Sequence, residues 1–314
     1  MRMGWLVVLA AVLGCRSADR GGLHIDPVLA GLVSSDAVFV AGVRMDKVRS
    51  TGLYQRWVAE ESALLERFRE RTGLDIRTDL TELLVVSDRK HVLGAARGRF
   101  NPADLEARIQ REGGRRMSYK GRTLIGQEQG ALWVLNSSTV VSGPAAALRG
   151  LIDGRGRTRA LSPLLERARK LPASSQLWAV SADPVWLAQA MPAPGNLANL
   201  RKLAGLLENG AFAADVSRGL SFSLQGSCRS EADARTLAEI LRGLVGLARL
   251  SAPDEAPELL RAYDGIRVEH GQSRVEVKGE IPEDLLDKLM VRFHKGELGW
   301  KSLLPPEGSL RGLK

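Results

Sequence analysis

Cysteine is scarce in this chain of 314 residues, and aromatic residues account for only 5% of it. The two cysteines, Cys15 and Cys228, provide no disulfide framework, so packing must hold the fold together. The four histidines lie far apart in the sequence, and no pair has the i, i+4 spacing of a helical zinc site. We therefore expect no metal centre.

Catalytic signatures are missing as well. The sequence contains no nucleophile elbow of the GxSxG type, no phosphate-binding loop with its lysine, and no paired-glycine dinucleotide fingerprint after a strand. Carboxylates occur throughout, but sequence alone does not show two of them facing across a cleft. We expect no cofactor, and the sequence favours a protein that is not an enzyme.

Long apolar runs are also absent from the start of the chain. The apolar run Leu6–Leu13 has eight residues, far fewer than the roughly 20 that a membrane-spanning helix needs. Arg2 precedes it, and a small residue, Gly14, follows it. A charged start, a short apolar middle and a small residue before the cleavage point are typical of a secretory signal.

The end of this signal, Val12-Leu13-Gly14-Cys15, resembles the lipobox of bacterial lipoproteins. The resemblance implies that Cys15 is acylated, for example with palmitate, and becomes the first residue of the mature chain. In such lipoproteins, an aspartate after the cysteine often retains the protein in the inner membrane. Arg16 stands there instead, which favours the outer membrane, facing the periplasm. An ordinary signal peptide that happens to contain a cysteine is the alternative.

The chain is basic. Its formal charge is +9 and its pI about 9.9, which favours anionic partners such as lipid head groups or acidic glycans. Nucleic acid is not expected as a partner of an exported, anchored protein. The densest basic cluster is Arg155, Arg157 and Arg159, in a glycine-rich stretch. It is either a solvated loop or an anion-binding loop.

Composition and periodicity predict an α+β fold of two similar tandem units, each an antiparallel or mixed sheet with helices packed on one face. The expected boundaries are a signal peptide (1–14), a lipidated tether (15–35), a first unit (36–153), a connector (154–174), a second unit (175–295) and a loose C-terminal tail (296–314).

Two sequence echoes suggest the duplication. The strand Gln176–Val185 matches the strand beginning at Asp36 together with its capping Asp46, and Arg97–Leu105 aligns with Lys278–Leu285. Elsewhere, Asn101 and Ser230 have the sequence context of helix N-caps. The first half of the chain resembles exported bacterial proteins of unassigned function. The resemblance lies in the order of its parts: a strand, a helix, Gly73–Leu80, a strand pair and then Tyr119–Arg122. It implies no active residue.

The tryptophans fall into two groups. Trp57, Trp133 and Trp178 lie in periodic apolar segments and are expected in the core. Trp186 and Trp300 lie beside proline-rich or glycine-rich stretches and are candidates for a partner surface.

Three functions remain open. We expect a membrane-anchored, non-catalytic binding or scaffold lipoprotein that engages an anionic envelope component or another protein. An envelope hydrolase whose site assembles only in three dimensions is one alternative, and a deep pocket with converging His, Asp or Glu would favour it. A carrier for apolar molecules is the other, and it requires an apolar cavity between sheet and helices.

Overall fold

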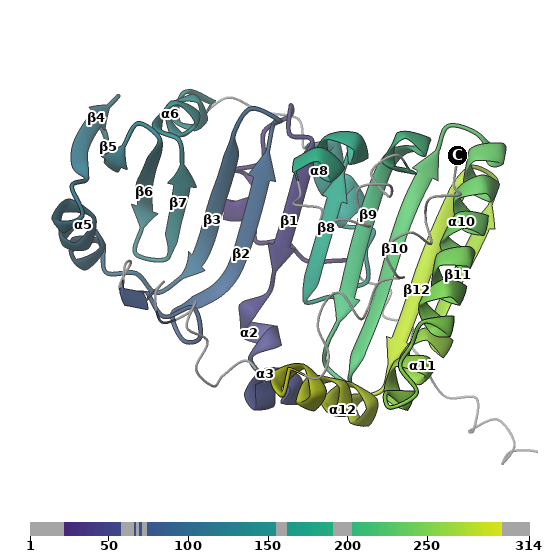
Figure 1. Cartoon of the computed structure of the whole chain (residues 1–314). Helices are drawn as coiled ribbons and strands as arrows, with labels where there is room; N and C mark the ends of the chain where they lie inside the picture. The colour runs from purple at the N-terminus through teal and green to yellow at the C-terminus, as the bar shows by residue number, and fades with distance from the viewer. Residues whose placement is uncertain are drawn as a thin grey trace, which may run out of the picture.

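The computed structural model describes residues 22–57, 66, 69–70, 74–154, 162–190 and 203–296. Within them, every strand belongs to one antiparallel sheet of 12 strands, in the order β11-β12-β10-β9-β8-β1-β2-β3-β7-β6-β5-β4. Figure 1 shows this sheet as a long, twisted layer. The α+β class is therefore confirmed.

The described part of the chain contains twelve strands. They are β1 (Phe39–Val43), β2 (Leu80–Ser87), β3 (Val92–Gly98), β4 (Arg115–Tyr119), β5 (Arg122–Gln127), β6 (Gly130–Asn136), β7 (Thr139–Gly143), β8 (Leu177–Ser181), β9 (Leu207–Asp215), β10 (Leu220–Cys228), β11 (Ile266–Gly271) and β12 (Arg274–Ile281).

The helices lie around this sheet. They are α1 (Pro27–Ala30), α2 (Met45–Val48), α3 (Gly52–Trp57), α5 (Pro102–Arg111), α6 (Ala145–Gly154), α7 (Pro163–Ala168), α8 (Pro184–Ala190), the 3-10 turn η1 (Ala204–Leu206), α10 (Glu231–Leu250), α11 (Pro257–Asp264) and α12 (Glu283–His294).

One continuous sheet replaces the two separate sheets that the sequence predicted. Its two halves meet where β1 pairs with β8, with Ala41 opposite Ala179. Pairing between strands so distant in sequence leaves no trace in local periodicity. The echo between Arg97–Leu105 and Lys278–Leu285 does not mark equivalent places, because β3 pairs with β2 and β7 whereas β12 pairs with β10 and β11.

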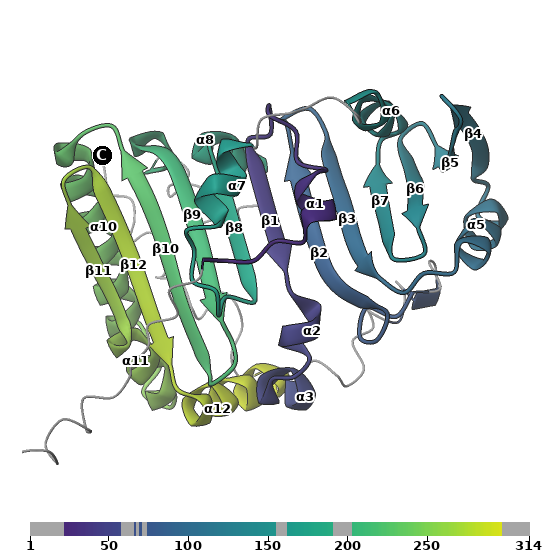
Figure 2. The same ribbon diagram turned by 180° about the vertical axis from the view of Figure 1, so that it is seen from behind.

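Helices cover both faces of the sheet, not one face as predicted. We call the face seen in Figure 1 the front face; it carries α5, α8 and α10. The opposite face, seen in Figure 2, is the rear face and carries α1 and α7. Side chains alternate between these faces along each strand.

The main core lies on the rear face. Leu29 from α1, Leu148 from α6 and Leu165 from α7 pack there with Val40 and Trp178 from the central strands, and each is at most 2% exposed. Burial of such side chains contributes about 1.5–3 kcal/mol each before entropy is counted. The rear face is therefore the well-packed side of the sheet.

The N-terminal arm is part of this core. The predicted tether extends to residue 35, but the described chain packs from Gly22, which forms an antiparallel bridge with Pro172. Leu23 and Ile25 are 2% and 4% exposed, and the side chain of Asp26 accepts hydrogen bonds from Val28 N and Leu29 N to cap α1. The connector likewise contains α7, capped by Ser162.

Candidate functional site

An apolar cavity of about 320 Å³ lies on the front face between the second half of the sheet and its helices. Its floor comes from β8, β9, β10 and β12, and its walls come from α8, η1 and α10. The lining side chains include Phe39, Ala179, Phe212, Leu224 and Leu241. A volume of this size is within the range of about 300–1,000 Å³ that ligand pockets occupy.

Among the described residues, none that lines this cavity is charged. Its two polar members are engaged elsewhere: Ser181 Oγ lies 3.4 Å from the Val38 carbonyl, and Gln225 Nε2 lies 3.1 Å from Glu276 Oε1 on the rear face. The cavity therefore offers contact area to hydrocarbon and almost no hydrogen bonds.

A second apolar cavity, of about 300 Å³, lies on the same face in the first half of the sheet. Leu83 and Val85 from β2, Ala96 from β3 and Leu105 and Ile109 from α5 line it. Strands β1 and β2 are neighbours, so Phe39 of the first cavity and Val85 of the second are on adjacent strands.

Strand register joins the two cavities into one row. Across eight neighbouring strands, the residues opposite one another on the front face are Val277, Leu224, Phe212, Ala179, Ala41, Val85, Gly94 and Ser142. We call the two cavities together with this row the apolar trough. Its middle is built from small residues, and Leu224 and Val85 are 49% and 39% exposed.

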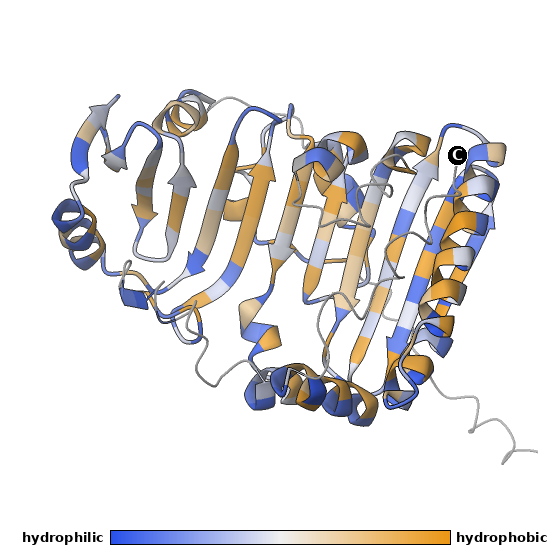
Figure 3. Ribbon diagram, viewed as in Figure 1, coloured by the Kyte–Doolittle hydropathy of each residue, from blue (hydrophilic) through white to orange (hydrophobic). Residues whose placement is uncertain are grey.

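The trough is bounded by an amphipathic helix. Ser230 caps α10, its side chain accepting a hydrogen bond from Asp233 N at 3.0 Å, and Leu237 and Leu241 project from α10 toward the cavity. Figure 3 shows β10 and β12 alternating between hydrophilic and hydrophobic residues, whereas β1 and β2 are largely hydrophobic. Alternation places the apolar residues of β10 and β12 on the front face.

Two cavities bring a histidine together with carboxylates, as the hydrolase alternative requires: the rear cavity of about 610 Å³, lined by Glu269, His270 and Glu276, and a smaller one of about 230 Å³, lined by Asp36, Asp88 and His91. His91 Nδ1 lies 3.3 Å from Asp88 Oδ2. However, Asp88 also accepts hydrogen bonds from the backbone of Lys90 and His91, which fixes the β2–β3 turn. Among the described residues no hydroxyl or thiol is hydrogen-bonded to the His91 ring, so no activated nucleophile is present there.

Glu82 is the carboxyl group with the most unusual environment among the described residues. Burial raises its pKa to about 7, and the nearby Asp26 carboxylate adds to this effect. Glu82 Oε1 has no hydrogen-bond partner in the described structure. It faces the rear side, opposite Arg97 on β3, and lines none of the cavities above, so we assign it a role in stability.

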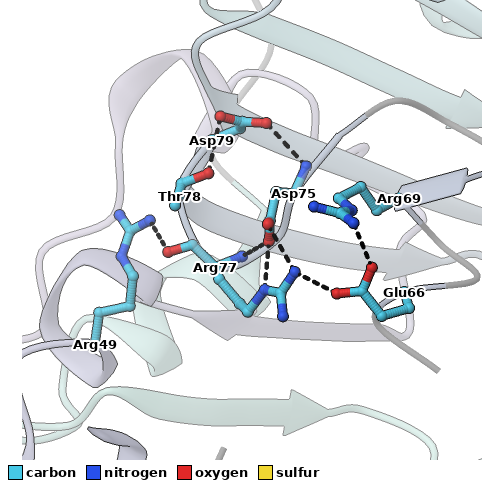
Figure 4. Close-up of polar contacts among 7 residues, drawn as sticks. All are labelled: Arg49, Glu66, Arg69, Asp75, Arg77, Thr78 and Asp79. Atoms are coloured by element: carbon cyan, nitrogen blue, oxygen red, sulfur yellow. Dashed lines mark hydrogen bonds and ion pairs between the residues drawn. The ribbon is translucent and has the colours of Figure 1, made fainter. Parts of the chain in front are cut away.

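The densest charged network is also structural (Figure 4). Arg77 Nε lies 2.8 Å from Asp75 Oδ1, and a second nitrogen of Arg77 lies 2.6 Å from Glu66. Hydrogen bonds from Arg77 hold the pKa of Asp75 below its usual range. Asp79 Oδ2 accepts a hydrogen bond from Asp75 N, so these carboxylates fix the turn that leads into β2.

The other sequence candidates have separate locations. Trp133 and Trp178 are buried as predicted, whereas Trp57 is half-buried and donates to Asp287 from its ring nitrogen at 2.7 Å. Trp186 is half-buried and packs on Phe39 with ring centroids 6.4 Å apart, so it contacts a residue that lines the trough. Cys15, Arg155, Arg157, Arg159 and Trp300 lie outside the described residues.

Cys228 is a free, buried thiol whose pKa is raised by burial, which makes it a poor nucleophile. Within the described ranges no group of three or more His, Cys, Asp or Glu side chains is placed to hold a metal ion. None of the described helices is both long and apolar enough to cross a bilayer.

No family model matches the sequence, and no curated protein matches it. The fold is similar to three crystal forms of TP0453, a protein of Treponema pallidum. Forms I, IV and III have TM-scores of 0.45, 0.47 and 0.49 and identities of 11%, 11% and 12%. The matches cover 83–85% of this chain and 96–99% of the other. A likeness at this level concerns the course of the chain and assigns no function.

The trough could not be recognised from the amino-acid sequence. Ala41 and Ala179 lie in runs that read as ordinary core strands, and nothing in such a run distinguishes a filled interior from one left open. The available signal was the surplus of apolar residues on both faces of β1, β2 and β8 relative to the helices predicted to cover them.

Proposed function

We propose that this protein is a lipid-anchored, non-catalytic binding protein of the bacterial cell envelope, and that its trough holds the hydrocarbon part of an apolar envelope molecule. The anchor is the acylated Cys15, and the favoured location is the outer membrane, facing the periplasm. The observation that carries the proposal is a charge-free cavity between sheet and helices that continues along a registered apolar row.

A long hydrocarbon chain suits this site better than a polar ligand. Neighbouring strands lie about 4.8 Å apart, so the row from β12 to β7 is roughly 34 Å long. Polar groups buried without hydrogen bonds are penalised, and the trough lining has few groups that would compensate for them. An acyl chain needs only apolar contact.

Binding can be tested with cis-parinaric acid, a fluorescent long-chain fatty acid, and the chain from Arg16 onward, which keeps every described residue. We expect saturable binding that Leu224→Asp weakens at least tenfold, because the new carboxylate lies in the floor of the cavity. Val92→Asp is the matched control, since Val92 is a strand residue, 53% exposed, that lines neither cavity. Equal binding by both variants would contradict the proposal.

Anchoring is tested separately by metabolic labelling with a tagged fatty acid. The natural chain should incorporate the label, and Cys15→Ala should not. Equal labelling of the two chains would refute acylation at Cys15 without affecting the trough.

We further propose that the two halves derive from one duplicated unit. The support is the order of elements that the halves share. In each, a strand and a helix come first, then a strand pair (β2–β3 or β9–β10), a helix (α5 or α10) and a final strand pair (β6–β7 or β11–β12). The last strand of each half, β7 or β12, pairs with the second strand of the first pair, β3 or β10.

A further inference from the structure

A third cavity, of about 610 Å³, lies on the rear face behind β9, β10 and β12. The strands that give Leu224 and Val277 to the trough give Gln225, Ser227 and Arg274 to this cavity. The end of α7 and the turn after it form the other wall, with Arg167 and Lys170. We call this cavity the cationic groove.

The positive charge of the groove comes from three cations. Across the described ranges, the side chains of Arg167, Lys170 and Arg274 form neither an ion pair nor a hydrogen bond with a carboxylate. Several surface arginines elsewhere are paired, as Arg149 is with Glu128 at 2.6 Å. Unpaired cations that converge on one concave surface produce a local positive potential.

Two carboxylates also line the groove, and both are already engaged. Glu276 accepts hydrogen bonds from Ser223 Oγ at 2.9 Å and Gln225 Nε2 at 3.1 Å, and it lies 2.9 Å from Lys278 Nζ. Glu269 lies 3.5 Å from the same lysine. Because Lys278 offsets part of their charge, the groove remains net positive.

The N-terminal arm enters the fold beside this groove. Leu23 N donates to the Leu171 carbonyl at 2.9 Å, and Gly22 pairs with Pro172, immediately after Lys170. Cys15 precedes Gly22 by seven residues, which span at most about 25 Å when fully extended. An acyl group on Cys15 therefore holds the groove close to the bilayer surface.

We infer that the cationic groove binds the phosphate-bearing head group of an anionic lipid in the membrane that anchors Cys15. The inference rests on the proposed anchoring. Arg167 and Arg274 supply guanidinium groups suited to phosphate oxygens, and Lys170 adds a point charge. In this orientation the trough, on the opposite face, points away from the anchoring membrane.

The test uses the acylated full-length chain in nanodiscs of phosphatidylcholine, with and without phosphatidylglycerol, followed by amide hydrogen exchange. With phosphatidylglycerol we expect exchange to slow about tenfold in the turns 169–173 and 271–273, because docking covers these backbone groups. The triple variant Arg167→Glu, Lys170→Glu, Arg274→Glu should lose this protection.

A matched variant separates the groove from general surface charge. Arg115→Glu, Arg122→Glu, Lys288→Glu changes the net charge equally at exposed positions away from the groove, and it should keep the protection. Equal exchange in both kinds of nanodisc, or equal loss in both variants, would overturn the inference. Protection by inorganic phosphate alone, in nanodiscs of phosphatidylcholine, would overturn the assignment to a lipid head group.

The two proposals fail in different ways. A chain without an acyl group on Cys15 does not enter the nanodisc at all, which refutes the anchor. An anchored chain whose turns exchange equally fast in both lipids refutes the groove and leaves the anchor intact.

Discussion

The rear and front faces of the sheet are built from the same strands but are packed differently. On the rear face, Val40, Leu84 and Val180 are at most 1% exposed beneath α1, α6 and α7. On the front face, Val85 and Leu224 are 39% and 49% exposed. The fold therefore obtains most of its apolar burial from one face and leaves apolar surface accessible on the other, which is typical of a binding surface.

The largest effect should come from the rear face. Trp178→Ala removes a side chain that is 2% exposed at the centre of the main core. We expect a loss of about 3–5 kcal/mol in the free energy of unfolding, because the substitution removes apolar contacts and leaves a cavity. Urea denaturation measures it, and a loss below about 1 kcal/mol would show that the rear face is not the main core.

Glu82 provides a pH-dependent test of the same face. A carboxyl group with a raised pKa stabilises the fold when protonated, and its contribution is lost as pH rises from the unfolded value of about 4.3 through about 7. Glu82→Gln should therefore raise the free energy of unfolding at pH 8 by up to about 3 kcal/mol and have little effect at pH 4.

The measurement is urea denaturation of both chains between pH 4 and pH 8. Glu239→Gln, at an exposed position on α10, is the control. It should leave the dependence of the free energy of unfolding on pH unchanged. If Glu82→Gln were as sensitive to pH as the natural chain, the assignment of this pH dependence to Glu82 would be wrong.

Local signals predicted much of the fold. The caps at Asn101 and Ser230 correctly place the starts of α5 and α10, since a capping side chain acts within a few residues of itself. The strand pair expected after Gly73–Leu80 is also present, as β2–β3. These features depend on neighbours in the sequence.

Long-range features were not predictable from local patterns. The pairing of β1 with β8 joins the halves, and the burial of Leu23 and Ile25 depends on a distant sheet. Helices α7 and α11 were missed because they are only six and eight residues long, which is too short for clear periodicity. The trough exists because the front-face helices leave part of the sheet uncovered. Local sequence does not show where those helices lie, so the trough residues resembled ordinary core residues.

A smaller effect is expected at the wall of the trough. Ser230→Ala removes the cap of α10 and should lower the free energy of unfolding by about 1 kcal/mol. Thermal or urea denaturation measures it, with Ser251→Ala at the other end of α10 as the control. Equal losses in the two variants would show that the cap does not stabilise this wall.

The smallest effect on stability should come from Ala179→Leu. This substitution tests most directly whether the front face is open to a ligand while the rear face is packed. Ala179 follows Trp178 on β8 but faces the trough, between Ala41 and Phe212. A leucine there has open volume to enter, so the free energy of unfolding should change by less than about 1.5 kcal/mol, whereas cis-parinaric acid should bind at least tenfold more weakly. Asn209→Leu, on the rear face of the adjacent strand and in the lining of neither trough cavity, should leave that binding unchanged. If Ala179→Leu bound the probe as well as the natural chain, the hydrocarbon would not lie over β8, and the trough as we define it would be wrong.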